Sequence, residues 1–390
     1  MGDQTSWRMK SLAFNKMKPY LAMISLQFGY AGMYIITMVS LKQGFSHWVL
    51  VVYRHAVATI VFAPFAFFLE RKLRPKMTLS VFLKIMLLAF LEPVLDQNLY
   101  YVGMKSTSAT FASAIVNVLP AITFMMAIIF RLEKVNPKQM HSLAKIIGTV
   151  VTVSGAMVMT LYKGPIVDIL WYSKGGSHHH HGPTADSADH EHWVRGTIML
   201  ISCLLGWSAF FIVQNKTLKE YPAELSLTSL VCFMGMVEGG VVALVMERHT
   251  GAWAIGFDSR LLAAAYSGIV CSGIAYYLQG IVNKVRGPVF VTAFSPLSTI
   301  ITAVLGAIIL SEQVHLGSLI GAIIIVFGLY SVVWGKSKDK TTSDMLTYHE
   351  GKAQELPVVD IKTSANVYND NFETNGNSHI PQINSLQQEP

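Results

Sequence analysis

The sequence has few charged residues and few cysteines. Aspartate, glutamate, lysine and arginine make up only 14% of its 390 residues, whereas hydrophobic residues make up 52%. A soluble domain carries about 25% charged residues, so this composition excludes an ordinary soluble protein and predicts a membrane protein. The three cysteines, Cys203, Cys232 and Cys271, lie in apolar runs and form no C-x-x-C pair. We therefore expect small packing residues rather than a disulfide or a metal site.

Signatures of catalysis are also missing. The sequence has no P-loop, no G-x-S-x-G motif and no H-E-x-x-H motif, so we expect neither an enzyme nor a bound cofactor. The histidine run His178 to His181, with His190 and His192, shows no fixed ligand spacing. It predicts a solvated loop rather than a zinc site, and no metal is expected. The net charge of +7 comes from short basic clusters between apolar runs, which indicate membrane topology rather than a nucleic-acid surface.

Ten apolar segments are long enough to cross a bilayer, which takes about 20 helical residues. They predict an all-α membrane protein with ten transmembrane helices. The predicted spans are Pro19 to Val39, Trp48 to Leu69, Leu79 to Val102, Ala109 to Phe130, His141 to Tyr162, Arg195 to Asn215, Leu225 to Met246, Leu261 to Val282, Pro288 to Leu310 and Val314 to Trp334.

The lysines and arginines near the span ends predict the orientation. With the N-terminus in the cytosol, eighteen of them fall in cytosolic segments and seven in outer segments, which favours cytosolic termini. The domains expected on this basis are a cytosolic N-terminus (1–18), a first five-helix repeat (19–162), an extracytosolic polar loop (163–194), a second five-helix repeat (195–335) and a disordered cytosolic tail (336–390).

The two halves of the chain resemble each other. Gly29 to Arg71 aligns with Gly206 to Arg248 without a gap at a shift of 177, and Lys105 aligns with Lys284 at a shift of 179. Gly148 and Gly155 repeat the spacing of Gly321 and Gly328. Because each half has an odd number of spans, the second copy must cross the membrane upside down. This predicts an inverted repeat, with a site at the midplane between the halves and alternating access about it.

Several segments of the transmembrane region have a distinctive sequence. They are Leu26 to Gly32, Tyr53 to His55, Arg74 to Thr78, Leu91 to Pro93 with Asp96 to Tyr101, Tyr162 to Pro165, Tyr221 to Leu227, Arg286 to Phe294 and Trp334 to Lys336. On these segments the region from about Pro19 to Lys336 resembles the plant nodulin-like, walls-are-thin-related branch of the drug/metabolite transporter superfamily, which has two EamA-type repeats and is also called the UMAMIT amino-acid transporters.

The resemblance implies ten spans, cytosolic termini, no ATP site, and facilitated or proton-linked passage of amino acids, often as export. Some members are linked to auxin, so an auxin or another small organic metabolite stays open as substrate. A receptor or scaffold that signals through the C-terminal tail is the alternative of another class. We expect the lipid bilayer, a small molecule and protons as partners, and the plasma membrane as location, with the vacuolar membrane second. The sequence does not indicate an oligomeric state.

Two acids in the third predicted span are the leading site candidates. Glu92 and Asp96 interrupt an apolar run and lie four residues apart, on one face of a helix. A charged side chain near the bilayer centre costs about 2.5 to 3.5 kcal/mol, so an acid there marks a functional site by default. Either acid suits the ammonium of an amino acid or a proton. The alternative is a structural pair bound to neighbouring hydroxyls, to Lys84 or to Arg54.

Further candidates follow from polar stripes and from the repeat. Thr110, Ser113 and Asn117 form one stripe in the fourth span, and Thr292, Ser295 and Thr299 form its counterpart in the ninth. They predict two faces of one cavity or, alternatively, interhelical hydrogen bonds. The remaining candidates for the path are Gln27, Tyr30, Asn98, Trp207, Tyr276, Tyr277 and Gln279.

Three prolines and a third acid complete the candidates. Pro93, Pro120 and Pro296 lie inside predicted spans, where each removes a backbone hydrogen bond and predicts either a hinge or a packing kink. Glu238 lies between Gly235 and Gly239, and we expect either a partner for Arg54 or His55 or, less favoured, a path-lining acid. At the shift of 179, Glu92 falls opposite Cys271, so the acid pair has no counterpart in the second half.

Overall fold

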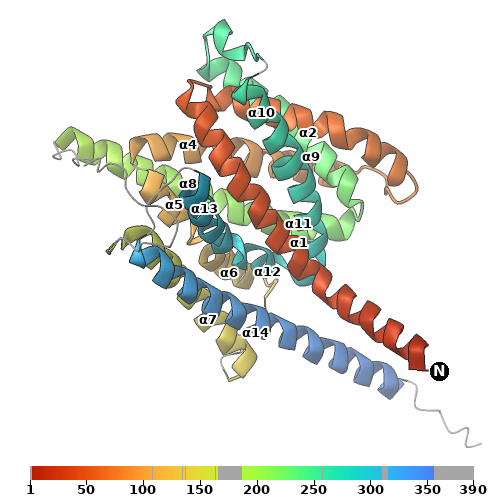
Figure 1. Ribbon diagram of the computed structural model, residues 1–390. Helices are drawn as coiled ribbons and strands as arrows, with labels where there is room; N and C mark the ends of the chain where they lie inside the picture. The colour runs from red at the N-terminus through yellow and green to blue at the C-terminus, as the bar shows by residue number, and fades with distance from the viewer. Residues whose placement is uncertain are drawn as a thin grey trace, which may run out of the picture. The chain divides into compact units, whose positions relative to one another are not determined.

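The regular structure of the chain is helical (Figure 1). The computed structural model describes residues 2–107, 109–133, 135–136, 138–162, 164–165, 187–256, 258–309 and 315–354. Residues up to Asp339 form one compact unit, and Lys340–Pro390 form a second. In the first half of the chain the helices are α1 Gly2–Lys42, α2 His47–Leu69, α3 Leu79–Ala89, η1 Phe90–Asp96, α4 Gln97–Ser106, α5 Ala109–Val116, α6 Leu119–Ile129 and α7 Met140–Leu161.

The second half repeats this order. Its helices are α8 Ser187–Glu220, α9 Glu224–Met246, η2 Thr250–Trp253, α10 Ser259–Tyr266, η3 Ser267–Ile274, α11 Ala275–Arg286, α12 Pro288–Ala293, α13 Ser295–Ile309 and α14 Leu316–Gln354. In both halves the third helical segment contains a π-helix, η1 or η3, and the fourth is broken into two helices.

Nine of the described helices are long and apolar enough to cross a membrane. They coincide with nine of the ten predicted spans, which confirms the all-α fold and agrees with the ten-helix count. The tenth is the predicted third span, which is present as the consecutive helices α3, η1 and α4. Its middle carries Glu92, Asp96 and two amides, which lower the hydropathy of the segment.

Two helices extend beyond the predicted span ends. α8 begins at Ser187, inside the segment predicted as a polar loop, and α14 continues to Gln354, inside the segment predicted as a tail. The polar stretch after Trp334 contains no proline before Pro357, and its lysines and glutamates are good helix formers. His178 to His181 and residues 355–390 lie outside the described residues.

The halves pack by exchanging equivalent contacts. α2 packs against η3 of the second half, and α9 packs against η1 of the first. Likewise α1 packs against α13 and α8 packs against α6. Each contact therefore has a counterpart with the two halves interchanged, as an inverted repeat requires.

The two π-helices arise in different ways. In η1, Pro93 has no backbone N–H to donate, so the regular ladder is interrupted and a wider turn is tolerated. η3 has no proline but contains Gly268 and Gly273. A Cβ on Gly268 would lie 2.5 Å from the backbone oxygen of Arg54, so glycine is what lets α2 approach η3 this closely.

Glycines also join the last helices of the two halves. A Cβ on Gly148 of α7 would lie 2.8 Å from the backbone oxygen of Gly328 of α14, and a Cβ on Gly321 would lie 2.6 Å from that of Gly155. We call these four glycines the glycine seam. Close backbone approach through small residues is the usual means by which helices associate in lipid. The seam pairs the matching glycines crosswise, because Gly148 lies against Gly328 and Gly155 against Gly321.

Lengthening one side chain of the glycine seam is expected to destabilise the protein. In Gly328→Leu the new Cβ would meet the backbone nitrogen of Thr152 at 2.5 Å, and overpacking of this kind costs about 1–3 kcal/mol. Thermal unfolding of the purified protein in detergent should show a lower midpoint. The control is Gly240→Leu, because nothing lies within 4 Å of a Cβ there. Equal midpoints for the two variants would contradict a close α7–α14 contact.

Candidate functional site

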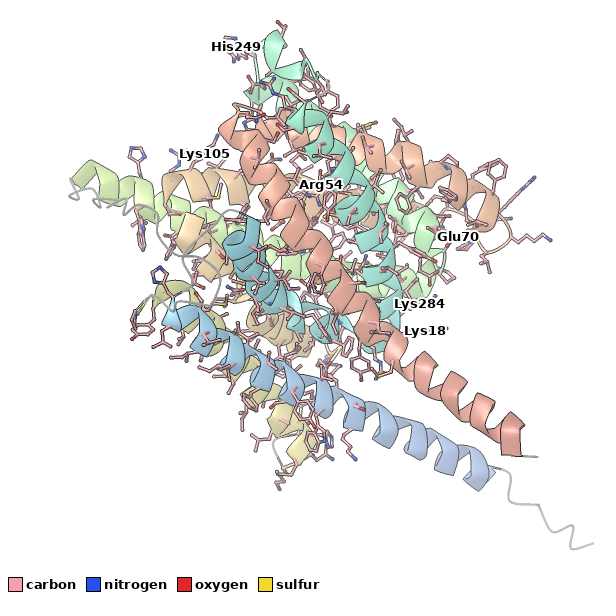
Figure 2. The ribbon with its side chains drawn as sticks, viewed as in Figure 1. Lys18, Arg54, Glu70, Lys105, His249 and Lys284 are labelled. Atoms are coloured by element: carbon pink, nitrogen blue, oxygen red, sulfur yellow. The ribbon has the colours of Figure 1, made fainter. Side chains whose placement is uncertain are left out.

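The candidate site lies where α2, η1, α8, η3 and α11 meet, so both halves contribute to it. Figure 2 shows Arg54 of α2 between Lys105, at the end of α4, and Lys284, near the end of α11. Lys105 and Lys284 are equivalent positions in the inverted halves, so they mark opposite sides of the membrane. Arg54 is 6% exposed and therefore belongs to the interior between these two sides.

Glu92 is a buried acid with one oxygen unused. It is 5% exposed, and its Oε1 accepts a hydrogen bond of 3.1 Å from the Gln97 amide. The two residues are five apart, and the π-helical turn of η1 brings positions i and i+5 together. The other oxygen, Oε2, is buried and has no partner among the described residues. A buried acceptor left in this state is costly, so Glu92 is available to a ligand.

Asp96 is held by the second half. It is 8% exposed, and its Oδ1 accepts a hydrogen bond of 2.8 Å from the thiol of Cys203 in α8. The sequence predicted that Cys203 is only a packing residue, whereas in the structure it also donates a hydrogen bond to Asp96. All three cysteines are free and buried.

A chain of hydrogen bonds holds Arg54 beside the acids. Its Nε donates to Ser272 Oγ over 2.6 Å, and the charge of Arg54 acts on both Glu92 and Asp96. His55 donates from Nδ1 to the carbonyl oxygen of Val51 (2.7 Å), so its Nε2 accepts in the neutral ring and faces Tyr276 OH at 3.4 Å. Ser272 and Tyr276 belong to η3 and α11, so this network also joins the halves.

The charges of the site do not cancel. Two carboxylates and one guanidinium give a net charge of −1 when all three are ionised. Within the described residues neither carboxylate forms an ion pair with Arg54, and Lys84, the other partner considered above, pairs with Glu220 at 2.5 Å. One more positive charge would balance the site.

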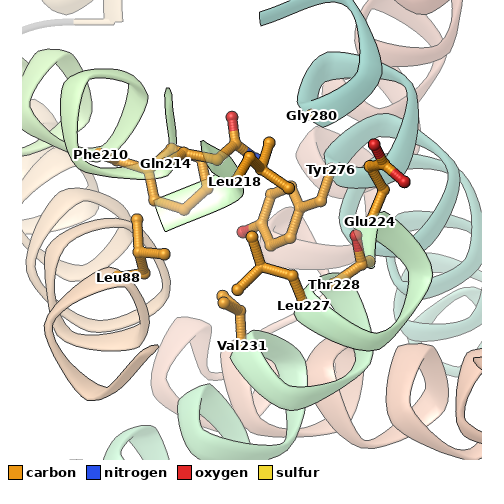
Figure 3. Close-up of a pocket in the computed structure, with 10 residues that line it drawn as sticks. All are labelled: Leu88, Phe210, Gln214, Leu218, Glu224, Leu227, Thr228, Val231, Tyr276 and Gly280. Atoms are coloured by element: carbon orange, nitrogen blue, oxygen red, sulfur yellow. The ribbon is translucent and has the colours of Figure 1, made fainter. Parts of the chain in front are cut away.

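A narrow cavity near Glu224 touches this network at Tyr276 (Figure 3). It is lined by residues of both halves, among them Leu88, Gln214, Glu224 and Tyr276. The free space is about 10 Å³, enough for roughly one water molecule. Tyr276 is 2% exposed, and its hydroxyl lies near His55 at the end of this cavity. In this conformation the cavity is therefore too small for a molecule larger than water.

Some predicted path residues do contact one another. The Gln279 amide donates to Tyr30 OH over 2.8 Å, which joins α11 to α1. Gln27 is buried one turn before Tyr30. Asn98 is buried too, but its amide donates to the carbonyl oxygen of Val94 in its own helix, over 2.7 Å.

The two polar stripes meet at one point. Thr299 donates to Asn117 Oδ1 over 2.8 Å, which is the interhelical hydrogen bond considered as the alternative to a cavity. Asn117 Nδ2 stays buried without a partner among the described residues. Thr292 donates within its own helix to the carbonyl oxygen of Pro288 (3.2 Å). Ser113 and Ser295 are partly buried, and the side chain of Thr110 lies outside the described residues.

The prolines predicted as hinges occupy special positions. Pro93 lies inside η1 and packs against Gly235 of α9, whose added Cβ would lie 2.7 Å from it. Pro120 lies in the first turn of α6, and Pro296 is the second residue of α13. The two spans are therefore broken just before these prolines, in a position where proline fits a helix without strain.

Three other candidates form no hydrogen bond or ion pair with the acids among the described residues. Trp207 is partly buried and its ring lies 6.3 Å from that of Phe211. Tyr277 is partly buried, whereas the adjacent Tyr276 lines the cavity. Glu238 forms no ion pair with Arg54 or His55 among the described residues, and its Oε2 is buried without a partner. The described residues also contain no group of three or more His, Cys, Asp or Glu side chains that could hold a metal ion.

Polar contacts close the two ends of the helix bundle differently. At one end Glu70, just after α2, accepts from the backbone N–H groups of Leu225 (2.9 Å) and Ser226 (2.7 Å) at the start of α9. Lys284 pairs there with Glu224 at 2.6 Å. At the other end the equivalent pair is Lys105 and His47, 3.5 Å apart. The carboxylate cap at the first end therefore joins α2 of the first half to α9 of the second.

Replacing Glu70 is expected to weaken this first end. In Glu70→Gln one carboxylate oxygen becomes an amide nitrogen, which cannot accept from a backbone N–H. We expect a loss of about 1–2 kcal/mol in stability, measured as a lower midpoint of thermal unfolding in detergent. Glu247→Gln is the matched control, since Glu247 occupies the equivalent position and its carboxylate accepts no hydrogen bond from a described residue. A drop of the same size in both variants would argue against the cap.

Comparison with known families gives two matching regions. The profile of the EamA-like transporter family matches residues 17–160 and 194–334. The WAT1-related protein At1g21890 of Arabidopsis thaliana is 62% identical over 336 residues, which are 85% of this chain and 86% of that protein. The WAT1-related protein At1g44800 of the same plant is 56% identical over 92% of this chain and 96% of its own length.

A solved crystal structure shares the fold. It superposes with a TM-score of 0.60 over 81% of this chain and 97% of its own, at 16% sequence identity. An identity this low carries the fold alone. The sequence relatives are much closer, and they cover both halves of this chain.

Proposed function

Because this chain belongs to the EamA-like transporter family, it is a multi-pass membrane transporter rather than an enzyme, and we propose that amino acids are its substrates. The observation that carries this proposal is the pattern of buried charge. Glu92, Asp96 and Arg54 place two acids and one cation together between the halves. An amino acid brings the complementary pattern, one ammonium and one carboxylate.

The ammonium of the substrate would bind Glu92 and Asp96. Glu92 Oε2 is buried with no partner among the described residues, and an ammonium donates up to three hydrogen bonds. The zwitterion adds no net charge, because its ammonium would offset one acid and its carboxylate would offset Arg54. In our proposal a proton on the other acid brings the net charge of the loaded site to zero.

The carboxylate of the substrate would bind Arg54. The Arg54 Nε is committed to Ser272, while its two terminal amino groups make no hydrogen bond to another described residue. Arginine binds carboxylates with paired N–H groups, which gives geometric selectivity as well as energy. Tyr30, Gln279 and Tyr276 would surround the remainder of the molecule, because they lie on the helices next to these groups.

Transport would proceed by rocking of the inverted halves. The exchanged contacts, α2 with η3 and α9 with η1, support two arrangements of similar energy, one open to each side. The narrow cavity beside Tyr276 is the path that would widen on the Glu224 side. In our proposal the protein exports amino acids or lets them pass both ways, across the plasma membrane or, as second choice, the vacuolar membrane, with both termini in the cytosol.

Flux through the purified protein in liposomes tests this proposal. We expect uptake of radiolabelled neutral amino acids, and faster uptake with an imposed proton gradient if the acids also carry a proton. Auxin and other organic anions without an ammonium group form the second arm of the substrate panel. Auxin flux without amino-acid flux would reassign the substrate, and a reconstituted protein that moves neither, yet keeps its phenotype in the plant, would favour a receptor or scaffold.

A further inference from the structure

A basic pocket lies away from the acids, at the ends of α6, α8 and α11. Its basic lining residues are Arg131, Lys219, Lys284, Arg286 and Lys336, and the described residues that line it include no acid. Its volume is about 280 Å³ and it opens to the outside of the molecule. This is enough room for a phosphate group, and the proposed transport path does not use it.

Three of these cations have no acidic partner among the described residues. Lys284 pairs with Glu224, and Lys336 pairs with Glu133, a carboxylate that also pairs with Lys145. Arg131, Lys219 and Arg286 form no ion pair within the described part of the chain. Bringing three like charges to one pocket is unfavourable unless an anion joins them, so the arrangement points to an anionic ligand.

Arg286 is held in place while one donor stays unused. Its guanidinium lies over the rings of Tyr20 and Phe290, with distances of 5.5 and 5.7 Å to the ring centroids. Its Nε is buried and has no hydrogen-bond partner in the described part of the chain. A buried donor that is unpaired and already oriented is a feature that a ligand acceptor would satisfy.

The backbone fixes two of the arginines at the pocket. Gly287 has φ of 84°, which lets α11 end at Arg286 directly before α12 begins at Pro288. Arg131 follows α6 with φ of 57°, a left-handed conformation that glycine or asparagine usually occupies after a helix. An arginine at this position adds charge to the pocket at a cost in backbone energy.

The pocket lies on the lysine- and arginine-rich side of the spans. The described segments that line it join the spans on the side where basic residues cluster in the sequence. On that side the membrane surface is anionic, and basic pockets between transmembrane helices bind lipid phosphates there. We propose that this basic pocket binds a phosphate monoester group, carried either by the head group of an acidic membrane lipid or by a small soluble phosphate.

Binding to the full-length protein in neutral phosphatidylcholine nanodiscs tests the proposal. The probes are short-chain phosphatidylinositol phosphate, the free inositol phosphate head group, inorganic phosphate and short-chain phosphatidylserine, each titrated by thermophoresis. Tighter binding of the lipid than of its free head group would assign a lipid source. Equal binding of the two would assign a soluble phosphate. Phosphatidylserine, which has no phosphate monoester, should bind most weakly.

Charge-matched variants give the decisive comparison. The triple variant Arg131→Asn, Lys219→Gln, Arg286→Gln should bind the phosphate probes at least about tenfold more weakly. The control triple variant Arg71→Gln, Lys72→Gln, Lys76→Gln removes three exposed charges on the same side and should stay within about twofold of the parent. The double variant Arg131→Asn, Lys219→Gln keeps the ring contacts of Arg286 and gives the same comparison if the triple variant does not fold.

Three results would overturn the proposal. They are equal loss of binding in the pocket and control variants, binding of phosphatidylserine as tight as that of the phosphate monoesters, and unchanged binding in the pocket variants. None of these results depends on amino-acid flux, so the basic pocket and the transport proposal are tested separately.

Discussion

Replacing both buried acids is expected to lower amino-acid flux at least about tenfold. In the double variant Glu92→Gln, Asp96→Asn the site keeps its size and loses both negative charges. Hydrogen bonds to charged groups are worth about 1.5–3 kcal/mol, and each 1.4 kcal/mol is a factor of ten in binding. Initial rates of radiolabelled uptake in liposomes, normalised to the amount of inserted protein, measure the effect.

A second intramembrane acid provides the control for this variant. Glu238→Gln on α9 changes the same functional group in a span, and Glu238 forms no ion pair with the site among the described residues. Its flux should stay close to that of the parent. If the double variant transports as well as Glu238→Gln, Glu92 and Asp96 have no part in transport.

Removing the positive charge of the site is expected to destabilise the folded protein. Arg54→Leu leaves Glu92 and Asp96 buried without the cation that acts on both. Breaking a buried ion pair costs about 3–5 kcal/mol, and this is an upper bound here because Arg54 forms no direct ion pair with either acid among the described residues. Thermal unfolding in detergent should show a much lower midpoint, and flux should be lost. Arg54→Lys should lie between parent and Arg54→Leu, since lysine keeps the charge but not the planar guanidinium.

Combining Arg54→Leu with the double acid variant shows whether Arg54 stabilises the protein by balancing the charge of the acids or by packing. In Arg54→Leu, Glu92→Gln, Asp96→Asn none of the three charges of the site remains, so no uncompensated charge is left buried there. The triple variant should therefore recover much of the midpoint that Arg54→Leu loses, while flux stays absent. A triple variant as unstable as Arg54→Leu alone would mean that Arg54 stabilises the protein through packing and its bond to Ser272 instead.

The span pattern could be predicted because lipid imposes a simple rule on the sequence. A helix that crosses a bilayer needs about 20 mainly apolar residues, and nine described helices match predicted spans within a few residues. The glycine seam could also be anticipated in part, since Gly148, Gly155, Gly321 and Gly328 show the same spacing in the two halves. That α7 and α14 meet through these glycines required coordinates.

The surroundings of the acids could not be predicted, because a π-helix changes which side chains share a face. The extra residue per turn in η1 places Gln97 against Glu92, whereas a regular helix would favour position i+4. η3 contains no proline, so the sequence does not predict its π-helical turn. It changes the helical phase just before Tyr276 and Tyr277, and Tyr276 is the one that lines the cavity. The sequence also did not indicate that the thiol of Cys203 donates a hydrogen bond to Asp96.

The broken fourth helices have a consequence for the transport cycle proposed above. The first half interrupts this span at Asn117 and Val118, and the second half interrupts it at Phe294. In an inverted repeat that alternates between two states, the halves trade conformations when access changes sides. In such a cycle the present conformation of one half is the expected conformation of the other half in the opposite state. The conformation of α12 and α13 therefore predicts the conformation of α5 and α6 when access is from the other side.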